Sequence, residues 1–123
     1  MYRRFWKSIN VEISTACILF VSLLHVGFFF LESVLWTKPA VRRLFGLSEA
    51  EAHTTKTLAL NQGFYNLGSA ALLMCFLATN NTEGLMAVLV FIVCMGLIGA
   101  ITANWRIILL QSIPALAALL LLL

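Results

Sequence analysis

The stretch HVGFFFLESVLW, residues 25–36, places a histidine and a glutamate inside a nearly unbroken run of large apolar side chains. The whole chain shares this character, because 62% of its 123 residues are hydrophobic and only 11% are charged. A soluble domain is about 45–50% apolar and about 25% charged. This chain therefore lacks the polar side chains needed to cover a globule in water. The composition predicts an all-α integral membrane protein with an ionisable pair inside its first span.

Four apolar stretches predict four transmembrane helices in a single domain that covers residues 1–123. Each has roughly the 20 residues that cross a bilayer, and the first carries Trp6 and Trp36 at its ends, where tryptophan favours the membrane interface. Short turns join the later stretches, so neighbouring helices must be antiparallel and form an up-down four-helix bundle. The predicted spans are residues 9–36, 57–79, 84–103 and 105–123, with a loop over 37–56.

Local signals in the loop predict how the second helix begins. Pro39 stops the first helix or starts a short amphipathic one, which Gly46 would end. The sequence SEAE that follows matches a capping box, in which Ser48 accepts from the third backbone amide and Glu51 reaches back. We therefore expect a helix to start here and to continue into the second span.

The third and fourth spans carry fewer signals. Thr82 followed by Glu83 predicts an N-cap and an acidic first turn for the third span. Pro114 predicts a kink in the fourth span. The third span also carries small residues that allow close helix contact, namely Gly96, Gly99, Ala100 and Ala103.

Polar side chains inside the predicted spans gather at one end of the bundle. His25 and Glu32 are seven residues apart, so they share a helix face. Alternating helix direction brings the end of span one and the starts of spans two and four to the same side. The opposite end of the bundle is almost purely apolar. We predict a polar, ligand-binding pocket at this mouth, formed by His25, Glu32, Asn61, Gln62, Tyr65, Asn66, Trp105, Arg106 and Gln111.

The pattern leaves two interpretations of these residues open. An ionised carboxylate in hydrocarbon costs a few kcal/mol, so Glu32 should face inward, toward Arg106, His25 or the amides of span two. In one interpretation the polar side chains only join helices, at about 0.6 kcal/mol for each hydrogen bond. In the other they line a pocket that holds a small ligand or moves a proton.

Three functions follow from these interpretations. The first is binding or transport of a small molecule or cation, with a proton coupled through Glu32; so short a chain would then act as a homodimer, joined through the small-residue stripe of span three. The second is a membrane enzyme for a lipophilic substrate, with His25 and Glu32 as acid and base. The third is a non-catalytic accessory subunit. The sequence favours the first, because no nucleophile spacing is present.

Other classes of partner are not expected. The three cysteines show no CxxC spacing, and His25 has no second histidine within the spans, so the sequence predicts neither a metal nor a cofactor. The basic residues lie at the ends of apolar segments, where lipid headgroups are found, which argues against nucleic acid. Five basic residues on the loop side against three at the N-terminus place the polar mouth toward the cytoplasm, with both termini outside.

Three segments resemble a known family: FFFLESVLWTKPAVRRLFGLS after His25, then TKTLALNQGFYNLGSAALL, then LLQSIPALAALLLLL. They are similar to small bacterial integral membrane proteins known only as domain of unknown function 1304. The resemblance implies four transmembrane helices in a bacterial cytoplasmic (inner) membrane, and it implies no activity. The family's motif positions fall on His25, Glu32, Trp36, Phe45, Gly46, Asn61, Gln62, Gly63, Tyr65, Asn66 and Gln111.

Overall fold

The computed structural model describes residues 2–123 of the chain, with side chains from residue 11 onward. The predictions that involve the side chains of Arg3, Arg4, Trp6 and Lys7 therefore lie outside the described residues. Residues 2–123 form helices and connections without any strand, which confirms the all-α prediction. The elements are α1 (Tyr2–Phe29), the π-helical turn η1 (Phe30–Val34), α2 (Pro39–Phe45), α3 (Glu49–Ala78), α4 (Thr82–Thr102), the π-helical turn η2 (Ile108–Ser112) and α5 (Ile113–Leu122).

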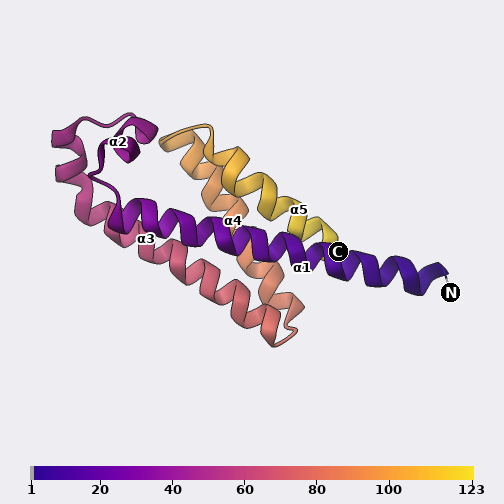
Figure 1. Cartoon of the computed structure of the whole chain (residues 1–123). Coiled ribbons are helices and arrows are strands. Elements are labelled where there is room, and N and C mark those ends of the chain that lie inside the picture. The colour runs from indigo at the N-terminus through magenta and orange to yellow at the C-terminus, as the bar shows by residue number, and fades with distance from the viewer. Residues whose placement is uncertain (1) are drawn as a thin grey trace.

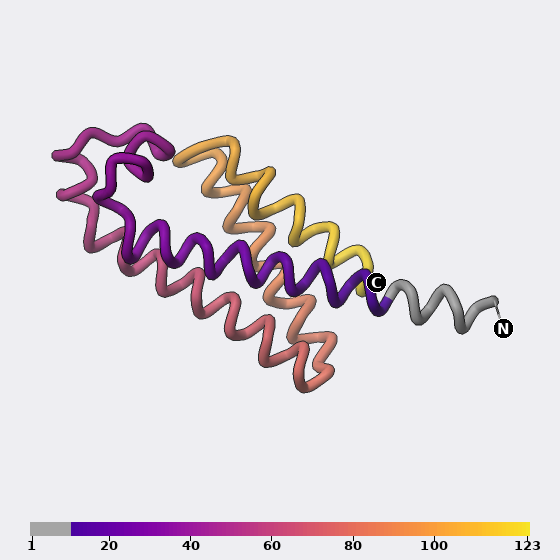
Figure 2. The backbone as a smooth tube through the Cα atoms, in the orientation of Figure 1, coloured from indigo at the N-terminus to yellow at the C-terminus, as the bar shows by residue number. Residues whose placement is uncertain are grey.

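The long helices follow one another around a ring and alternate in direction (Figure 1). α1 packs against α3 and α5, and α4 packs against the same two helices from the opposite corner. The tube in Figure 2 shows α3 and α4 diverging from the turn that joins them, while α5 returns along α1. Each helix can therefore turn one side to the centre of the ring, where residues distant in sequence meet.

The centre of the ring is filled by apolar side chains over one part of its length. Leu73 and Leu89 have no exposed surface, and Ala115 and Ala118 of α5 are equally buried. The small alanines let α5 lie close to its neighbours, so that larger residues of α1 and α4 can fill the space between helices. The apolar core consists of Ile18, Val21, Leu73, Leu85, Val88, Leu89, Ile92, Ala115 and Ala118.

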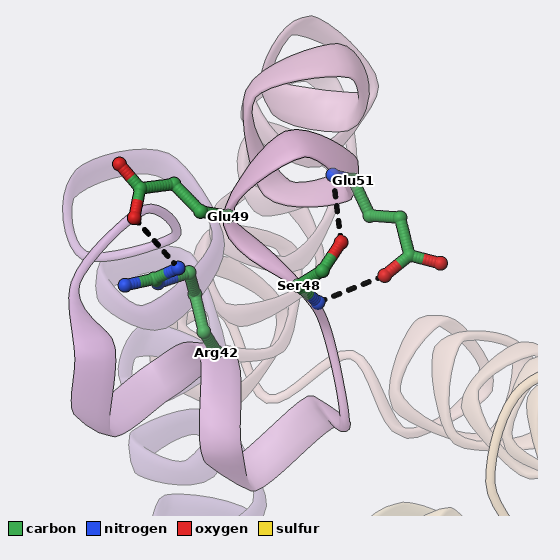
Figure 3. Close-up of polar contacts among 4 residues, drawn as sticks. All are labelled: Arg42, Ser48, Glu49 and Glu51. Carbon is green, nitrogen blue, oxygen red and sulfur yellow. Dashed lines mark hydrogen bonds and ion pairs between the residues drawn. The ribbon is translucent and has the colours of Figure 1, made fainter.

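The connection between α1 and α3 forms as its local signals predict (Figure 3). Gly46 ends α2 at φ +70°, a left-handed conformation that glycine adopts without strain. The capping box is confirmed: Glu51 N donates to Ser48 Oγ at 3.2 Å, and Ser48 N donates to Glu51 Oε2 at 2.8 Å. Arg42 in the last turn of α2 also pairs with Glu49, with 3.2 Å between Nη1 and Oε2. These contacts tie α2 to the start of α3.

The start of α4 differs from the prediction by one residue. The N-cap is Asn81, whose Oδ1 accepts from the backbone N–H of Gly84 at 2.9 Å, so the assignment of the cap to Thr82 was wrong. Asn80 before it has φ 52°. Asparagine tolerates this left-handed conformation better than most residues. The chain therefore turns at Asn80, and Asn81 is the first residue placed to cap the helix.

Two helices end or begin in a π-helical turn, which the sequence analysis did not predict. In η1 the N–H of Leu35 donates to the carbonyl of Phe30 at 3.0 Å. In η2 the N–H of Ile113 reaches the carbonyl of Ile108. Pro114 follows directly, and a proline has no N–H and clashes with the carbonyl four residues earlier. The irregularity predicted at Pro114 thus takes the form of a widened turn before it.

Large apolar side chains cover much of the outer surface. Ile101 is 87% exposed, Leu58 71% and Leu23 68%. Two helices, Val11–Val34 and Thr82–Thr102, are long and apolar enough to cross a membrane. The polar residues of α3 interrupt its apolar sequence, and the five residues of η2 with the ten of α5 extend only about 22 Å. Length and composition therefore indicate membrane association most clearly for α1 with η1 and for α4.

Candidate functional site

His25 is buried in the middle of the helix assembly, with 1% of its surface exposed. Its Nδ1 lies 2.9 Å from the carbonyl oxygen of Val21, one turn earlier in α1. A carbonyl can only accept, so Nδ1 must carry a proton and donate it. Among the described residues Nε2 is buried and has no hydrogen-bond partner. Phe28 packs edge-on against the ring at 5.7 Å between centroids.

Glu32 lies in η1 and reaches across to α3. Its Oε2 accepts a hydrogen bond from Asn66 Nδ2 at 2.7 Å. Arg106, His25 and the amides of span two were the expected partners of this carboxylate, and the partner found is an amide of α3. Within residues 11–123 the salt bridge found joins Arg42 to Glu49, and Arg106 forms none. The π-helical turn places Glu32 on the α3 side of the chain, one residue before Ser33, which donates to the carbonyl of Leu60 at 3.3 Å.

A close approach between η1 and α3 supports this contact. Gly63 is buried, and a Cβ at its position would collide with Ser33 Oγ and come within 3.2 Å of the carbonyl oxygen of Phe29. Only glycine permits the two backbones to come so near. Its place three residues before Asn66 in α3 brings that amide within reach of Glu32 in η1.

The second π-helical turn, η2, joins the site from the opposite side of the ring. Ser112 Oγ donates to the carbonyl of Val93 at 3.1 Å, and Gln111 Nε2 lies 3.5 Å from the carbonyl of Ile92. A Cβ at Gly96 would collide with Ser112 Oγ. The small-residue stripe of α4 therefore packs within this chain at Gly96, and at Gly99 it faces Ile107. A dimer through this stripe, as expected above, would have to displace the chain's own η2.

The polar residues of these elements surround a cavity of about 240 Å³. Four of them come from one face of α3, because positions i, i+3, i+4 and i+7 lie in line on a helix. α1 contributes one residue and η2 another, while the remaining wall is an apolar face of α4. We call this space the His25 cavity; it is lined by His25, Gln62, Tyr65, Asn66, Ser69, Phe91, Ile92, Met95 and Gln111.

The His25 cavity includes five of the nine predicted ligand-binding residues: His25, Gln62, Tyr65, Asn66 and Gln111. Glu32 does not line it, but its hydrogen bond to Asn66 places it directly behind the wall. Asn61, Trp105 and Arg106 do not line it and are exposed. Asn61 does not line the cavity because its side chain lies about 100° around the helix axis from that of Gln62. The cavity also lies beside the middle of α4 and not at its end.

Four lining residues were missed by sequence reasoning: Ser69, Phe91, Ile92 and Met95. Ser69 follows Gln62 by seven residues, so helix periodicity alone could have placed it on the same face. The α4 residues gave no such signal, because every side of that helix is apolar around them. Only the packing of α4 against α3 and η2 decides which of its sides faces the cavity.

The arrangement limits the chemistry that the site can perform. No hydrogen bond joins His25 to Glu32 among the described residues, since each has its own partner at Val21 and Asn66. An acid–base pair of these two residues is therefore not assembled in this conformation. In the part of the chain that the structure describes, no group of three His, Cys, Asp or Glu residues is placed to hold a metal ion.

Comparison with known proteins places the chain in a family. The model of the family described as "Protein of unknown function (DUF1304)" matches residues 19–123. The chain belongs to this family. It is also 31% identical over 105 residues to "Uncharacterized protein YpaA" of Lactococcus lactis subsp. lactis (strain IL1403), covering 82% of this chain and 88% of that protein. The match confirms the resemblance seen in the three quoted segments. No solved structure gives a significant match.

Proposed function

We propose that this DUF1304 protein is a four-helix integral membrane bundle that binds a small molecule in the His25 cavity. Membrane insertion is supported by the outer surface, where residues such as Leu58, Ile101 and Leu120 are exposed on three different helices. A helix that is apolar on all sides must be buried in protein or in lipid. In α4, most of the apolar surface faces away from the other helices, which supports lipid as its surroundings.

The observation that carries the proposal is a cavity lined by six polar side chains together with three apolar ones of α4, in a largely apolar assembly. Polar side chains in a membrane interior are expensive, and those that face a bundle interior mark binding sites or pathways. The volume of about 240 Å³ equals that of about eight water molecules at ~30 Å³ each. This is slightly below the roughly 300 Å³ at which drug-sized ligand pockets begin. We therefore propose a ligand of small size, with one polar and one apolar side.

Glu32 gives this site a route for coupling to a proton. Its carboxylate is half-buried and bonded to Asn66, which itself lines the cavity. A proton on Glu32 would alter the hydrogen bond that orients Asn66 toward the ligand. We propose that this hydrogen bond couples transport of the ligand to transfer of a proton at Glu32. Glu32 itself lies behind the wall, and the titratable groups that line the cavity are His25 and Tyr65.

We further propose that the bundle lies in the bacterial cytoplasmic membrane with the α1–α3 connection in the cytoplasm. The basic residues Lys38, Arg42, Arg43 and Lys56 on and around this connection support that orientation under the positive-inside rule. Reporter fusions at the C-terminus would test it. An active cytoplasmic reporter at Leu123 would contradict the orientation.

Methionine methyl groups offer a direct test of binding. The chain has four methionines, of which Met95 lines the His25 cavity and Met74 lies in a separate apolar groove between α1 and α3. Protein labelled with ¹³C-methyl methionine is placed in lipid nanodiscs and titrated with phenol. We expect the Met95 signal to shift and saturate, while Met74 and Met86 change only in proportion to phenol dissolved in the lipid.

Two neighbouring substitutions provide the matched control. Gln62→Trp places a bulky ring at the cavity, whereas Asn61→Trp places it on an exposed side of the same helix turn. Gln62→Trp should weaken the Met95 response, and Asn61→Trp should preserve it. Equal, non-saturating shifts of all methionine signals in the unmodified protein would overturn the binding proposal. For proton coupling, Glu32→Gln should weaken the pH dependence of phenol affinity relative to the unmodified protein, while any part that arises at His25 remains.

A further inference from the structure

The orientation of the His25 ring indicates the chemistry of the ligand. Because Nδ1 donates to the carbonyl of Val21, the neutral ring presents Nε2 as an acceptor. Nε2 is buried and unpartnered among the described residues, and His25 lines the cavity, so a donor in the cavity reaches Nε2 once a small side-chain shift uncovers it. We infer that Nε2 accepts a hydrogen bond from an O–H or N–H group of a neutral, lipid-soluble ligand. This inference rests on the proposed function, namely that the cavity holds a small molecule.

The need for a donor follows from the cost of an unpaired acceptor. Buried polar atoms nearly always have a hydrogen-bond partner, and an unsatisfied one costs the free energy of its lost hydration. A second tautomer cannot remove the problem, since Nδ1 would then lose its proton and face the Val21 carbonyl without a hydrogen bond. Within residues 11–123, no side chain or backbone group supplies a donor to Nε2. A ligand donor would complete the ring's hydrogen bonds.

The lining excludes a charged ligand and favours a neutral one. The nine residues around the cavity include no lysine, arginine, aspartate or glutamate that could neutralise a charge directly. The side-chain amides of Gln62, Asn66 and Gln111 can instead form hydrogen bonds with either a donor or an acceptor group of the ligand. An uncompensated charge buried among such residues is disfavoured by many times the free energy of a neutral hydrogen bond.

The exposed rim of the cavity favours a ligand that arrives from the lipid. Tyr65 of α3 is 65% exposed, and Phe91 and Met95 of α4 are 50% and 39% exposed, yet all three line the cavity. The opening therefore lies at the side of the assembly between α3 and α4, which diverge from their turn (Figure 2). In a membrane this side faces the acyl chains. A molecule with an apolar body and one hydroxyl or amine group can place its apolar part against α4 and its polar group against the polar side chains of the lining.

Phenol and anisole provide the test, because they share the aromatic ring while only phenol has an O–H donor. Both are titrated into the ¹³C-methyl methionine protein in nanodiscs, with affinities read from Met95 and corrected for partition into lipid. A hydrogen bond of ordinary strength predicts about fivefold to tenfold tighter binding of phenol. His25→Phe should abolish this preference while anisole still binds, and His25→Gln, which keeps an acceptor, should retain part of it.

A measurement on the unmodified protein covers the case in which His25→Phe does not fold. With ¹⁵N-labelled histidine, His25 should show an unprotonated Nε2 whose signal shifts with phenol and not with anisole. His53, exposed at the start of α3, serves as the internal reference. A protonated Nε2, or equal affinity for phenol and anisole, would overturn this inference while leaving the binding proposal intact. Absence of any saturable Met95 response to both probes would instead overturn the proposed function itself.

Discussion

The two ends of this helix assembly are built in different ways. Toward the α3–α4 turn, residues such as Leu73, Leu89 and Ala118 exclude solvent completely and leave only apolar contacts. Toward η1 and η2, the same four helices surround the His25 cavity, and side-chain hydrogen bonds such as that from Asn66 to Glu32 cross between them. We call the apolar part the closed end and the part from the middle of α4 toward η1 and η2, where directional contacts bound the cavity, the open end.

The difference shows how a small bundle can keep a polar cavity without losing its fold. In the membrane proposed above, lipid is as apolar as leucine, so the helices would be held by close packing and hydrogen bonds and not by exclusion of water. The closed end supplies packing. The open end supplies two glycine contacts, Gly63 with Ser33 and Gly96 with Ser112, which fix the helices on either side of the cavity. The cavity is thus bounded by rigid contacts.

The largest effect should come from damage to the closed end. Leu89→Ala removes a side chain with 0% exposure, and the remaining void should lower the free energy of unfolding by about 2 kcal/mol. Met95→Ala, two turns away at the cavity and 39% exposed, should cost much less because space already exists there. Unfolding in mixed micelles measures both. Equal losses would contradict the division of the molecule into a closed and an open end.

A glycine at the open end should show the next largest effect. Gly63→Ala brings a Cβ against Ser33 Oγ and should destabilise the fold by about 1.5 kcal/mol. Gly68→Ala lies in the same helix, and among the described residues nothing beyond the helix's own nearby backbone comes within 4 Å of the new Cβ. It should be neutral or stabilising, since alanine favours helix. Thermal unfolding compares the two. Similar melting temperatures for both variants would show that the η1–α3 contact is not tightly packed.

The capping box at the open end should contribute slightly less. Ser48→Ala removes the acceptor for the Glu51 N–H, which should reduce stability by about 1 kcal/mol. The loss should concentrate in the first turn of α3, while the closed end keeps its protection. Amide hydrogen exchange, read residue by residue, measures this distribution. A loss of protection spread evenly over α3 and α4 would contradict it.

The same capping box predicts a pH dependence. The Ser48 hydroxyl and then the Ser48 backbone N–H lower the pKa of Glu51, because both favour its charged form. The resulting stabilisation is present above the pKa of Glu51 in the unfolded chain and is lost as the pH falls through the lower, folded value. The protection factors of amides at the start of α3, corrected for the intrinsic slowing of exchange in acid, should therefore fall as the pH is lowered. In Glu51→Gln this acid-dependent step should disappear.

The smallest effect should come from the hydrogen bond behind the cavity. Asn66→Ala removes the donor to Glu32 and should cost about 0.6 kcal/mol, the average for such bonds between membrane helices. Glu32→Gln keeps an acceptor oxygen and should change stability less. Both are measured by unfolding in the same micelles as Leu89→Ala. A greater loss from Glu32→Gln would mean that the charge of Glu32, and not its hydrogen bond, holds α3.

Much of the site was predicted from the sequence because helix periodicity fixes relative direction. Gln62 and Asn66 were both predicted to line the pocket, and their spacing of four residues puts them on one face of α3, where both line the cavity. The capping box at Ser48 and Glu51 also formed, since it depends only on residues three apart. Trp105 and Arg106 were assigned to the pocket from depth alone, which does not determine on which side of a helix a residue lies. They lie outside the cavity lining for that reason.

The sequence by itself determined the all-helical class, the helix caps near Ser48 and the set of polar residues available for a site, because these depend on composition and on contacts within a few residues. Only the tertiary structure decided which of those residues meet. The partner of Glu32, the apolar wall formed by Phe91 and Met95, and the unpaired nitrogen of His25 all depend on how far α4 and the two π-helical turns rotate against α3. That rotation is set by side-chain packing between segments distant in sequence, and a local sequence pattern cannot predict it.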